Sequence, residues 1–215
     1  MRVASKGLFI AFEGIDGSGK TVQVHKLTEW IFAHYRRVDT IVVTHEPTDS
    51  KFTKEIHERA SLKNTDDRSM PKERLLELFV LDRSEHVDNI IIPNLEKKAV
   101  VLCDRYKYST IAYQSAQGVP IAHAISENEE FPTPDLTFIF NVSAEKAVER
   151  LQKQGKELDK FIKIPFLEKV KEQYLKLPGL LPKEKIQIIN ANQTIEQIHD
   201  DVKRAVKPLL DEIVK

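Results

Sequence analysis

The chain has little cysteine, no excess of either charge and no long apolar run, and each shortage excludes a class of protein. Its 215 residues contain one cysteine, Cys103, which excludes an internal disulfide framework and is typical of the reducing cytosol. Basic and acidic residues both number 33, so no overall positive charge indicates a nucleic-acid partner. No apolar run reaches the roughly 18 residues of a membrane-spanning helix. We therefore expect a cytoplasmic protein without a membrane or nucleic-acid partner.

Short apolar runs alternate with stretches of helical periodicity along the chain. The apolar runs lie at 8–12, 40–43, 99–103, 136–142 and 186–189, and the helical stretches lie at about 20–36, 51–62, 72–95, 106–117, 143–153, 165–176 and 194–213. Runs that are apolar throughout are typical of parallel strands covered on both faces. The alternation predicts one α/β domain over residues 1–215, with a doubly wound, parallel five-stranded sheet flanked by helices. The polar segment at 152–160 indicates either a mobile flap or a solvated helix end.

A phosphate-binding loop joins the first apolar run to the first helical stretch. Its G-x-x-x-x-G-K-[ST] pattern begins at Gly14 and ends with Gly19, Lys20 and Thr21. The glycines let the backbone wrap around an anion, which the loop N–H groups and the positive end of the helix dipole attract. Lys20 can reach the β- and γ-phosphates, and the Thr21 hydroxyl can bind Mg²⁺. The motif predicts a nucleoside triphosphate site.

Further polar residues follow the third apolar run, where ligands bind in such sheets. Asp104 could hold Mg²⁺ through water, and the adjacent Arg105 could bind a phosphate through two N–H groups. Alone this pair is more often a surface ion pair, but beside a phosphate loop it predicts a second phosphate site. Phe79 and Arg83 are four residues apart, so both can meet one planar ligand from a single helix face. Phe79 alone would more often belong to the core, whereas Arg83 is harder to explain there.

Together these segments resemble the thymidylate kinase family, which phosphorylates dTMP to dTDP. The resemblance covers nearly the whole chain, through F-E-G-I-D-G-S-G-K-T, H-E-P-T-D-S, L-F-V-L-D-R-S-E-H, D-R-Y-K-Y-S-T-I-A-Y-Q, P-D-L-T-F-I-F-N-V and G-K-E-L-D-K-F in family order. It implies a P-loop NTPase-type fold with a small lid at about 150–162, and Mg²⁺-assisted, in-line phosphoryl transfer from ATP to dTMP. It also implies a homodimer. Leu76, Val80, Val87 and Ile91 form an apolar face that fits either an interface or the core.

The resemblance assigns roles to individual residues. Those expected to bind ATP are Gly14, Asp16, Gly17, Ser18, Gly19, Lys20, Thr21 and, by a looser match to a loop that borders adenine, Asn192. Those expected to contact dTMP are Asp16, His45, Glu46, Phe79, Arg83, Arg105, Tyr106, Ser109, Thr110, Tyr113 and Gln114. Catalytic roles are expected for Lys20, Asp16, Arg105 and the lid residues Arg150, Lys153 and Lys156, and Mg²⁺ is expected at Thr21 and Asp104.

Within the acceptor site the resemblance is more detailed. Asp16 would contact the deoxyribose 3′-hydroxyl, and Arg105 would hold the dTMP phosphate. Phe79 would stack on thymine while Arg83 donates to a carbonyl of the base. Tyr106 would pack beneath the sugar and disfavour a 2′-hydroxyl. The resemblance therefore predicts a pocket that selects both the base and the sugar.

Three features depart from the family pattern. His45 stands where the family often has an arginine beside the dTMP phosphate, and Gly17 stands where some members carry an arginine. The lid is rich in lysine where bacterial-type members use arginine, and lysine lacks the planar fork that binds phosphate. The identity of the catalytic cation is therefore open at this point.

Two other functions remain open from the sequence. One is a broader deoxynucleoside monophosphate kinase, because the methyl group that separates dTMP from dUMP is worth only about 1–3 kcal/mol in a fitted pocket. The other is a non-catalytic nucleotide-binding regulator, which His45 and the lysine-rich lid would favour. A DNA-dependent ATPase is disfavoured by the neutral charge and by the lack of an aromatic series for single-strand binding.

Overall fold

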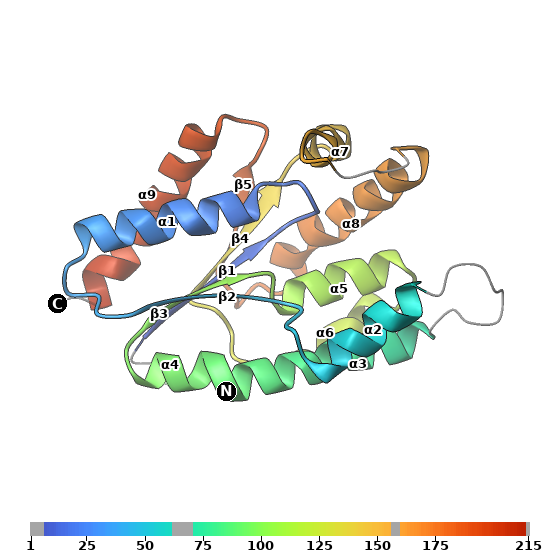
Figure 1. The fold of residues 1–215 in the computed structure, drawn as a ribbon, viewed down its shortest axis with the longest axis horizontal. Helices are drawn as coiled ribbons and strands as arrows, with labels where there is room; N and C mark the ends of the chain where they lie inside the picture. Colours follow the sequence, from blue (N-terminus) through green and yellow to red (C-terminus); the bar gives the residue numbers. More distant parts are fainter. Residues whose placement is uncertain (1–6, 62–70, 156–159, 214–215) are drawn as a thin grey trace.

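The computed structural model describes residues 7–61, 71–155 and 160–213 and is built around a five-stranded sheet. The strands are β1 (Leu8–Glu13), β2 (Ile41–His45), β3 (Val100–Asp104), β4 (Leu136–Asn141) and β5 (Ile186–Asn190). They lie in the order β2-β3-β1-β4-β5, and every neighbouring pair is parallel (Figure 1). Each strand ends within about two residues of a predicted apolar run. The predicted parallel five-stranded sheet is therefore confirmed.

Helices cover both faces of the sheet. α1 (Lys20–His34) and α9 (Ile195–Ile213) pack on one face, and α4 (Ile92–Glu96) and α8 (Lys160–Leu180) pack on the other (Figure 1). Beside α4 and α8 lie α2 (Lys51–Ser61), α3 (Lys72–His86), α5 (Lys107–Ala116) and α6 (Ile121–Ser126), and α7 (Ala144–Lys153) packs against α8. The architecture is the predicted doubly wound α/β fold.

The three central strands form the core. All six residues of β1 are buried, as are nearly all of those in β3 and β4. The edge strands β2 and β5 are only partly covered, and Val43 and Ile188 are each 44% exposed. The prediction that the strands are covered on both faces therefore applies to the central strands. A strand covered on both faces requires an uninterrupted apolar run.

Several helices differ from the sequence prediction. The stretch expected as one helix at 72–95 is α3, the five-residue π-helix η1 (Val87–Ile91) and α4 in continuous succession. α8 is longer than the expected 165–176, and α6 was not predicted because its six residues are too few to show a helical period. Of the proposed flap at 152–160, residues 156–159 lie outside the described part of the chain.

The apolar face on α3 and η1 belongs mainly to the core of the chain itself. Leu76, Val87 and Ile91 are at most 3% exposed, and Val80 packs partly buried against them. Between the two readings of this face, the structure therefore favours the core. None of the described helices combines the length and apolar character that a membrane crossing requires.

Candidate active site

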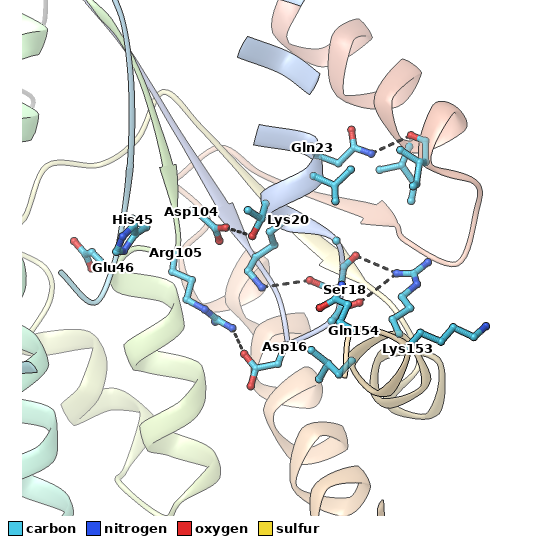
Figure 2. Close-up of a pocket in the computed structure, with 18 of the residues that line it drawn as sticks. Asp16, Ser18, Lys20, Gln23, His45, Glu46, Asp104, Arg105, Lys153 and Gln154 are labelled. Atoms are coloured by element: carbon cyan, nitrogen blue, oxygen red, sulfur yellow. Dashed lines mark hydrogen bonds and ion pairs between the residues drawn. The ribbon is translucent and has the colours of Figure 1, made fainter. Parts of the chain in front are cut away.

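The phosphate loop encloses a buried lysine. The Lys20 ammonium donates to the carbonyl oxygens of Gly14 and Ile15, each at 3.0 Å. It also lies 3.5 Å from the Ser18 hydroxyl (Figure 2). Burial, and next the charge of Arg105, lower the pKa of Lys20 to about 8. A desolvated cation is stabilised by an anion brought beside it. The loop is therefore suited electrostatically to a phosphate group.

Gly17 lies where the loop meets α7. Its φ is 79°, and a Cβ atom at this position would lie 2.4 Å from the carbonyl oxygen of Ala147. A side chain at position 17 would thus strain the backbone and displace α7. This is the physical reason why the arginine that some family members carry in the loop has no room here.

We expect Gly17→Ala to lower the free energy of unfolding by about 1–3 kcal/mol more than Gly155→Ala, the range typical of overpacking. Gly155 is the matched control because its φ of 80° imposes the same backbone strain, while a Cβ atom there meets none of the described residues within 4 Å. Urea unfolding of the two variants measures the difference. Equal losses would show that the contact with Ala147 costs nothing.

Arg105 connects the end of β3 to the phosphate loop. Its Nη2 donates to Asp16 Oδ1 at 2.6 Å (Figure 2). Its Nη1 donates to Ser109 Oγ at 3.0 Å and to the Gly14 carbonyl at 3.2 Å. The guanidinium carbon lies 5.1 Å from the centroid of the Tyr113 ring. Arg105 has a φ of 71°, which is uncommon for a residue with a side chain and is found most often at functional sites. Four predicted substrate residues therefore meet at one point.

The two predicted metal ligands also meet. The Thr21 hydroxyl donates to Asp104 Oδ2 at 2.5 Å, at the amino end of α1 (Figure 2). A hydroxyl and a carboxylate are hard oxygen ligands, which Mg²⁺ prefers. In the described part of the chain no cluster of three or more His, Cys, Asp or Glu residues is arranged to hold a metal. The pair therefore fits a Mg²⁺ ion whose remaining ligands are phosphate oxygens and water.

Two cavities adjoin at the carboxyl edge of the sheet. A cavity of about 850 Å³ follows the phosphate loop and the start of α1, and one of about 330 Å³ lies against α3 and α5. Four residues line both, namely Asp16, Glu46, Pro47 and Arg105. Ligands in the two cavities would approach each other at this boundary.

The smaller cavity gathers nearly all the predicted dTMP contacts. Its lining includes Asp16, Glu46, Phe79, Arg83, Arg105, Tyr106, Ser109, Thr110, Tyr113 and Gln114. His45 is the exception, since it is exposed and lines the larger cavity, with its Nδ1 3.0 Å from the Pro47 carbonyl oxygen. Ile56 and Leu75 also line the smaller cavity, and the sequence did not predict them there. The cavity is therefore mixed in character, with aromatic and apolar walls and a few convergent polar groups, as is typical of small-molecule sites.

Arg83 is held rigidly at the wall of this cavity. Its side chain is buried, with Nε donating to Glu46 at 2.9 Å, Nη2 donating to Thr110 at 2.8 Å and Nη1 donating to Asn128. Glu46 also interacts with the His86 ring at 3.0 Å. The predicted base-reading arginine is thus fixed by neighbours before any ligand binds.

Two buried polar atoms at the smaller cavity have no partner among the described residues. They are the Tyr106 hydroxyl and the Gln114 Oε1, on residues that are 0% and 2% exposed. A buried polar atom without a hydrogen bond carries a cost that a suitable ligand can remove. Both residues contribute to the lining of the smaller cavity.

The larger cavity extends from the phosphate loop to the start of α9. Val22 and Ile195 line it with 41% and 45% of their surfaces exposed, and the Gln23 side chain donates to the Ile195 carbonyl at 3.0 Å. Asn192, predicted beside adenine, is exposed and hydrogen-bonded to Asn190, and it is not among the described lining residues. The apolar lining from α1 and α9 was missed because neither helix face carries a motif.

The predicted lid cations differ in their placement. Arg150 in α7 donates to the carbonyls of Gly17, Ser18 and Ala191, so it joins the phosphate loop to the loop after β5. Lys153 lines the larger cavity but extends away from the phosphate loop and pairs with Glu149 at 2.6 Å (Figure 2). Lys156 lies outside the described residues.

Glu13 is a buried carboxylate at the site to which the sequence reasoning gave no role. It receives hydrogen bonds from Tyr106, Ser109 and Tyr174, and burial raises its pKa to about 7 although Ser109, Arg105 and Lys20 act in the opposite direction. An acid at the end of an apolar strand was the signal available, because the same pattern singled out Asp104. Tyr174 carries no such signal.

Comparison with known proteins agrees with this geometry. A family profile described as thymidylate kinase matches residues 12–202. The chain is 39% identical over 206 residues to a probable thymidylate kinase of Pyrococcus horikoshii, an alignment that covers 94% of this chain and 97% of the relative. A probable thymidylate kinase of Pyrococcus abyssi is 37% identical over 206 residues, with the same coverage.

A third relative is similar over nearly the whole chain. The thymidylate kinase of Desulfotalea psychrophila is 34% identical over 205 residues, covering 95% of this chain and 96% of the relative. The match thus spans the phosphate loop, both cavities and the last strand. The predicted family is confirmed: the chain belongs to the thymidylate kinase family and is a phosphotransferase.

Proposed function

We propose that this chain transfers the γ-phosphoryl group of ATP to dTMP, forming ADP and dTDP by in-line displacement with Mg²⁺. The observation that carries this proposal is the pair of cavities that adjoin at Asp16 and Arg105. ATP would occupy the larger cavity, with its phosphates on the loop. dTMP would occupy the smaller one, with its phosphate at Arg105.

The chemistry asks mainly for positioning and charge. Lys20 and the loop N–H groups would hold the donor phosphates, and Arg105 would hold the acceptor phosphate, so that two anions meet despite their repulsion. The acceptor is already a phosphate, so a strong general base is not required. Mg²⁺, held by Thr21 and Asp104, would neutralise charge on the phosphates.

The smaller cavity supplies the features that recognise a thymine nucleotide. Phe79 is half-buried in its wall and would stack on the base, while the fixed Arg83 and the unpartnered Gln114 would bond to its polar edge. Asp16 would contact the 3′-hydroxyl. Tyr106, buried with its ring 5.0 Å from that of Phe9, would leave no room for a 2′-hydroxyl.

The whole chain would act as one kinase domain with a lid at about 150–162. Arg150 is the lid cation best supported by contacts, because its guanidinium already lies against the Gly17 and Ser18 carbonyls of the phosphate loop. Lys153 is 73% exposed at its side chain and could turn inward at modest cost, since a surface ion pair such as that with Glu149 is worth about 0–1 kcal/mol.

We also propose a homodimer located in the cytoplasm. The dimer rests on the family resemblance, and the location rests on the single buried cysteine, Cys103. Since Leu76, Val87 and Ile91 are buried within one chain, the interface would use other residues. Light scattering coupled to size exclusion measures the mass in solution, and a monomer would contradict the dimer.

His45→Arg is expected to lower the KM for dTMP about threefold to tenfold, because arginine can bind phosphate through two parallel hydrogen bonds. His45 ends β2 next to Asp104 in the register of the sheet, close to the proposed phosphate site. Steady-state kinetics at saturating ATP measures the effect. His25→Arg, at an exposed position of α1, is the control for added charge, and an equal response of both variants would place position 45 away from the phosphate.

The reaction itself is tested by following the γ-phosphate. With ATP labelled at the γ-position, dTMP and Mg²⁺, we expect the label to appear in dTDP, and a chelator to stop its appearance. Label released only as inorganic phosphate would contradict the proposal, since it would show hydrolysis without transfer to the acceptor.

A further inference from the structure

The Glu13 carboxylate lies behind Arg105 and accepts hydrogen bonds from two elements. Oε1 accepts from the backbone N–H groups of Tyr106 at 2.7 Å and Ser109 at 3.3 Å. Oε2 accepts from the hydroxyls of Ser109 at 2.6 Å and Tyr174 at 3.1 Å. Glu13 is 0% exposed and is not among the described residues that line either cavity. Glu13 therefore makes no direct contact with a ligand in either cavity.

The first connection to Arg105 runs through the backbone. The Arg105 N–H donates to the Phe12 carbonyl at 2.9 Å, and the next N–H, that of Tyr106, donates to Glu13 Oε1. Arg105 has a φ of 71°, a conformation that persists only where the surroundings enforce it. The end of β1 thus holds the peptide groups on both sides of Arg105, and Glu13 supplies one of these two contacts.

The second connection runs through the Ser109 hydroxyl. Ser109 Oγ lies 2.6 Å from Glu13 Oε2 and 3.0 Å from Arg105 Nη1. A guanidinium only donates and an ionised carboxylate only accepts. In the ionised form of Glu13, which predominates above its pKa of about 7, Ser109 must therefore accept from Arg105 and donate its own proton to the carboxylate. The Tyr174 hydroxyl, 2.8 Å from Ser109 Oγ, donates to the same carboxylate.

We propose that Glu13 is a positioning residue that aims the Arg105 guanidinium at the boundary of the two cavities, through the Tyr106 N–H and the Ser109 hydroxyl. The inference rests on the proposed function, because the orientation of Arg105 affects turnover only if Arg105 binds the acceptor phosphate. Glu13 itself touches no substrate. Its role is to keep the strained Arg105 in one orientation.

Glu13→Gln tests this with little change of volume. The amide replaces one acceptor oxygen by an NH₂ group, which faces donors in either orientation. In one orientation it opposes the N–H groups of Tyr106 and Ser109. In the other it donates to the Ser109 hydroxyl and competes with Arg105 for the same oxygen. Both orientations disturb the Arg105 position.

The measurement is a double-mutant cycle on kcat/KM for dTMP with Glu13→Gln, Arg105→Lys and the double variant. We expect Glu13→Gln alone to lower kcat/KM for dTMP about tenfold, the usual scale for a hydrogen bond to a charged group, with the KM for ATP changed less than about twofold. In the Arg105→Lys background the same substitution should lower kcat/KM for dTMP less than about twofold, because the guanidinium that Glu13 orients is already absent. Equal losses in both backgrounds would overturn the proposal.

Glu184→Gln is the matched control. Glu184 accepts from Lys107 at 2.8 Å and from Tyr108 at 2.5 Å, so it also anchors α5 through buried donors, but it has no contact with Arg105 among the described residues. Its replacement should reduce thermal stability while kcat/KM for dTMP stays within about twofold. A tenfold loss in this control would mean that any weakening of α5 mimics the effect, and it would also overturn the proposal.

Two further measurements keep the test decisive. If Glu13→Gln does not fold, Ser109→Ala and Tyr174→Phe take its place, because each removes one hydroxyl donor to the carboxylate. The double-mutant cycle with Arg105→Lys is then measured with these variants. If the wild-type protein fails to turn over dTMP, the proposed function fails by itself. The cycle is then measured on the midpoint of urea unfolding, which needs no substrate, and additive effects of Glu13→Gln and Arg105→Lys there would overturn the inference.

Discussion

Lys20→Ala is expected to lower kcat by about a thousandfold or more, while the Kd for dTMP changes less than about threefold. The Lys20 ammonium is buried in the phosphate loop, within 3.0 Å of two carbonyl oxygens, and lines only the cavity proposed for ATP. The motif predicts that it contacts the β- and γ-phosphates. Its removal leaves the charge that develops during transfer without this compensation. Turnover assays and calorimetric titration with dTMP measure the two quantities separately.

The control for this result lies on the same helix. Lys26→Ala removes a partly exposed lysine of α1 whose ammonium lies 3.9 Å from Glu196, and we expect its kcat to stay near the wild-type value. A collapse of dTMP affinity in Lys20→Ala would contradict the division into donor and acceptor cavities. Retention of more than about a tenth of the wild-type kcat would exclude Lys20 from the role in phosphoryl transfer.

Arg105→Lys is expected to lower kcat/KM for dTMP about a hundredfold to a thousandfold and to change the KM for ATP less than about threefold. Arginine bonds here to Asp16 and Ser109 through separate nitrogen atoms, which leaves a planar, oriented group at the boundary of the cavities. Lysine keeps the charge but offers a single ammonium that cannot keep both contacts and also hold a phosphate. Steady-state kinetics with each substrate varied in turn measures this selectivity.

Arg204→Lys provides the comparison for Arg105→Lys. Arg204 is 77% exposed at its side chain and pairs with Asp201 on the surface of α9, so its replacement should leave both kinetic constants unchanged within about twofold. A loss in Arg105→Lys that affects ATP and dTMP equally would show that the residue supports the phosphate loop and does not hold the acceptor.

The strands and the phosphate loop could be predicted because their signals are local. A strand covered on both faces needs a continuous apolar run, and the loop needs glycine, lysine and threonine at fixed spacing. Phe79 and Arg83 could be paired because a helix brings residues four apart onto one face. Asp104 could be found because it ends a strand in a sheet whose first strand leads into a phosphate loop, which is the edge where ligands bind.

The remaining parts of the site depend on packing between distant elements. Asn128, which fixes Arg83, lies in the turn that follows α6, an element too short to show a period. Tyr174 reaches Glu13 from α8, 161 residues along the chain. The constraint on Gly17 comes from the backbone of α7 and leaves no trace in the loop sequence. Contacts of this kind are set by helix packing, which no local pattern encodes.

Glu13 shows a different limit. Its position at the end of β1 follows the same pattern as that of Asp104 at the end of β3, and the two strands are neighbours in the sheet. The signal was present, but the adjoining phosphate loop explained the segment so fully that the acid preceding it received no role. By the criterion of an acid at the end of a buried strand, Glu13 is as much a candidate as Asp104.

The central claim is that the smaller cavity selects dTMP, and an acceptor panel tests it most directly. ADP release with ATP and Mg²⁺ would be measured for dTMP, dUMP, dGMP, dCMP and UMP in turn. We expect fast turnover with dTMP and much slower turnover with the other four, because Phe79, Arg83 and Gln114 line the proposed base site and Tyr106 would exclude a 2′-hydroxyl. Comparable turnover of several acceptors would contradict this account of the cavity, and no turnover with any of them would contradict the proposed reaction.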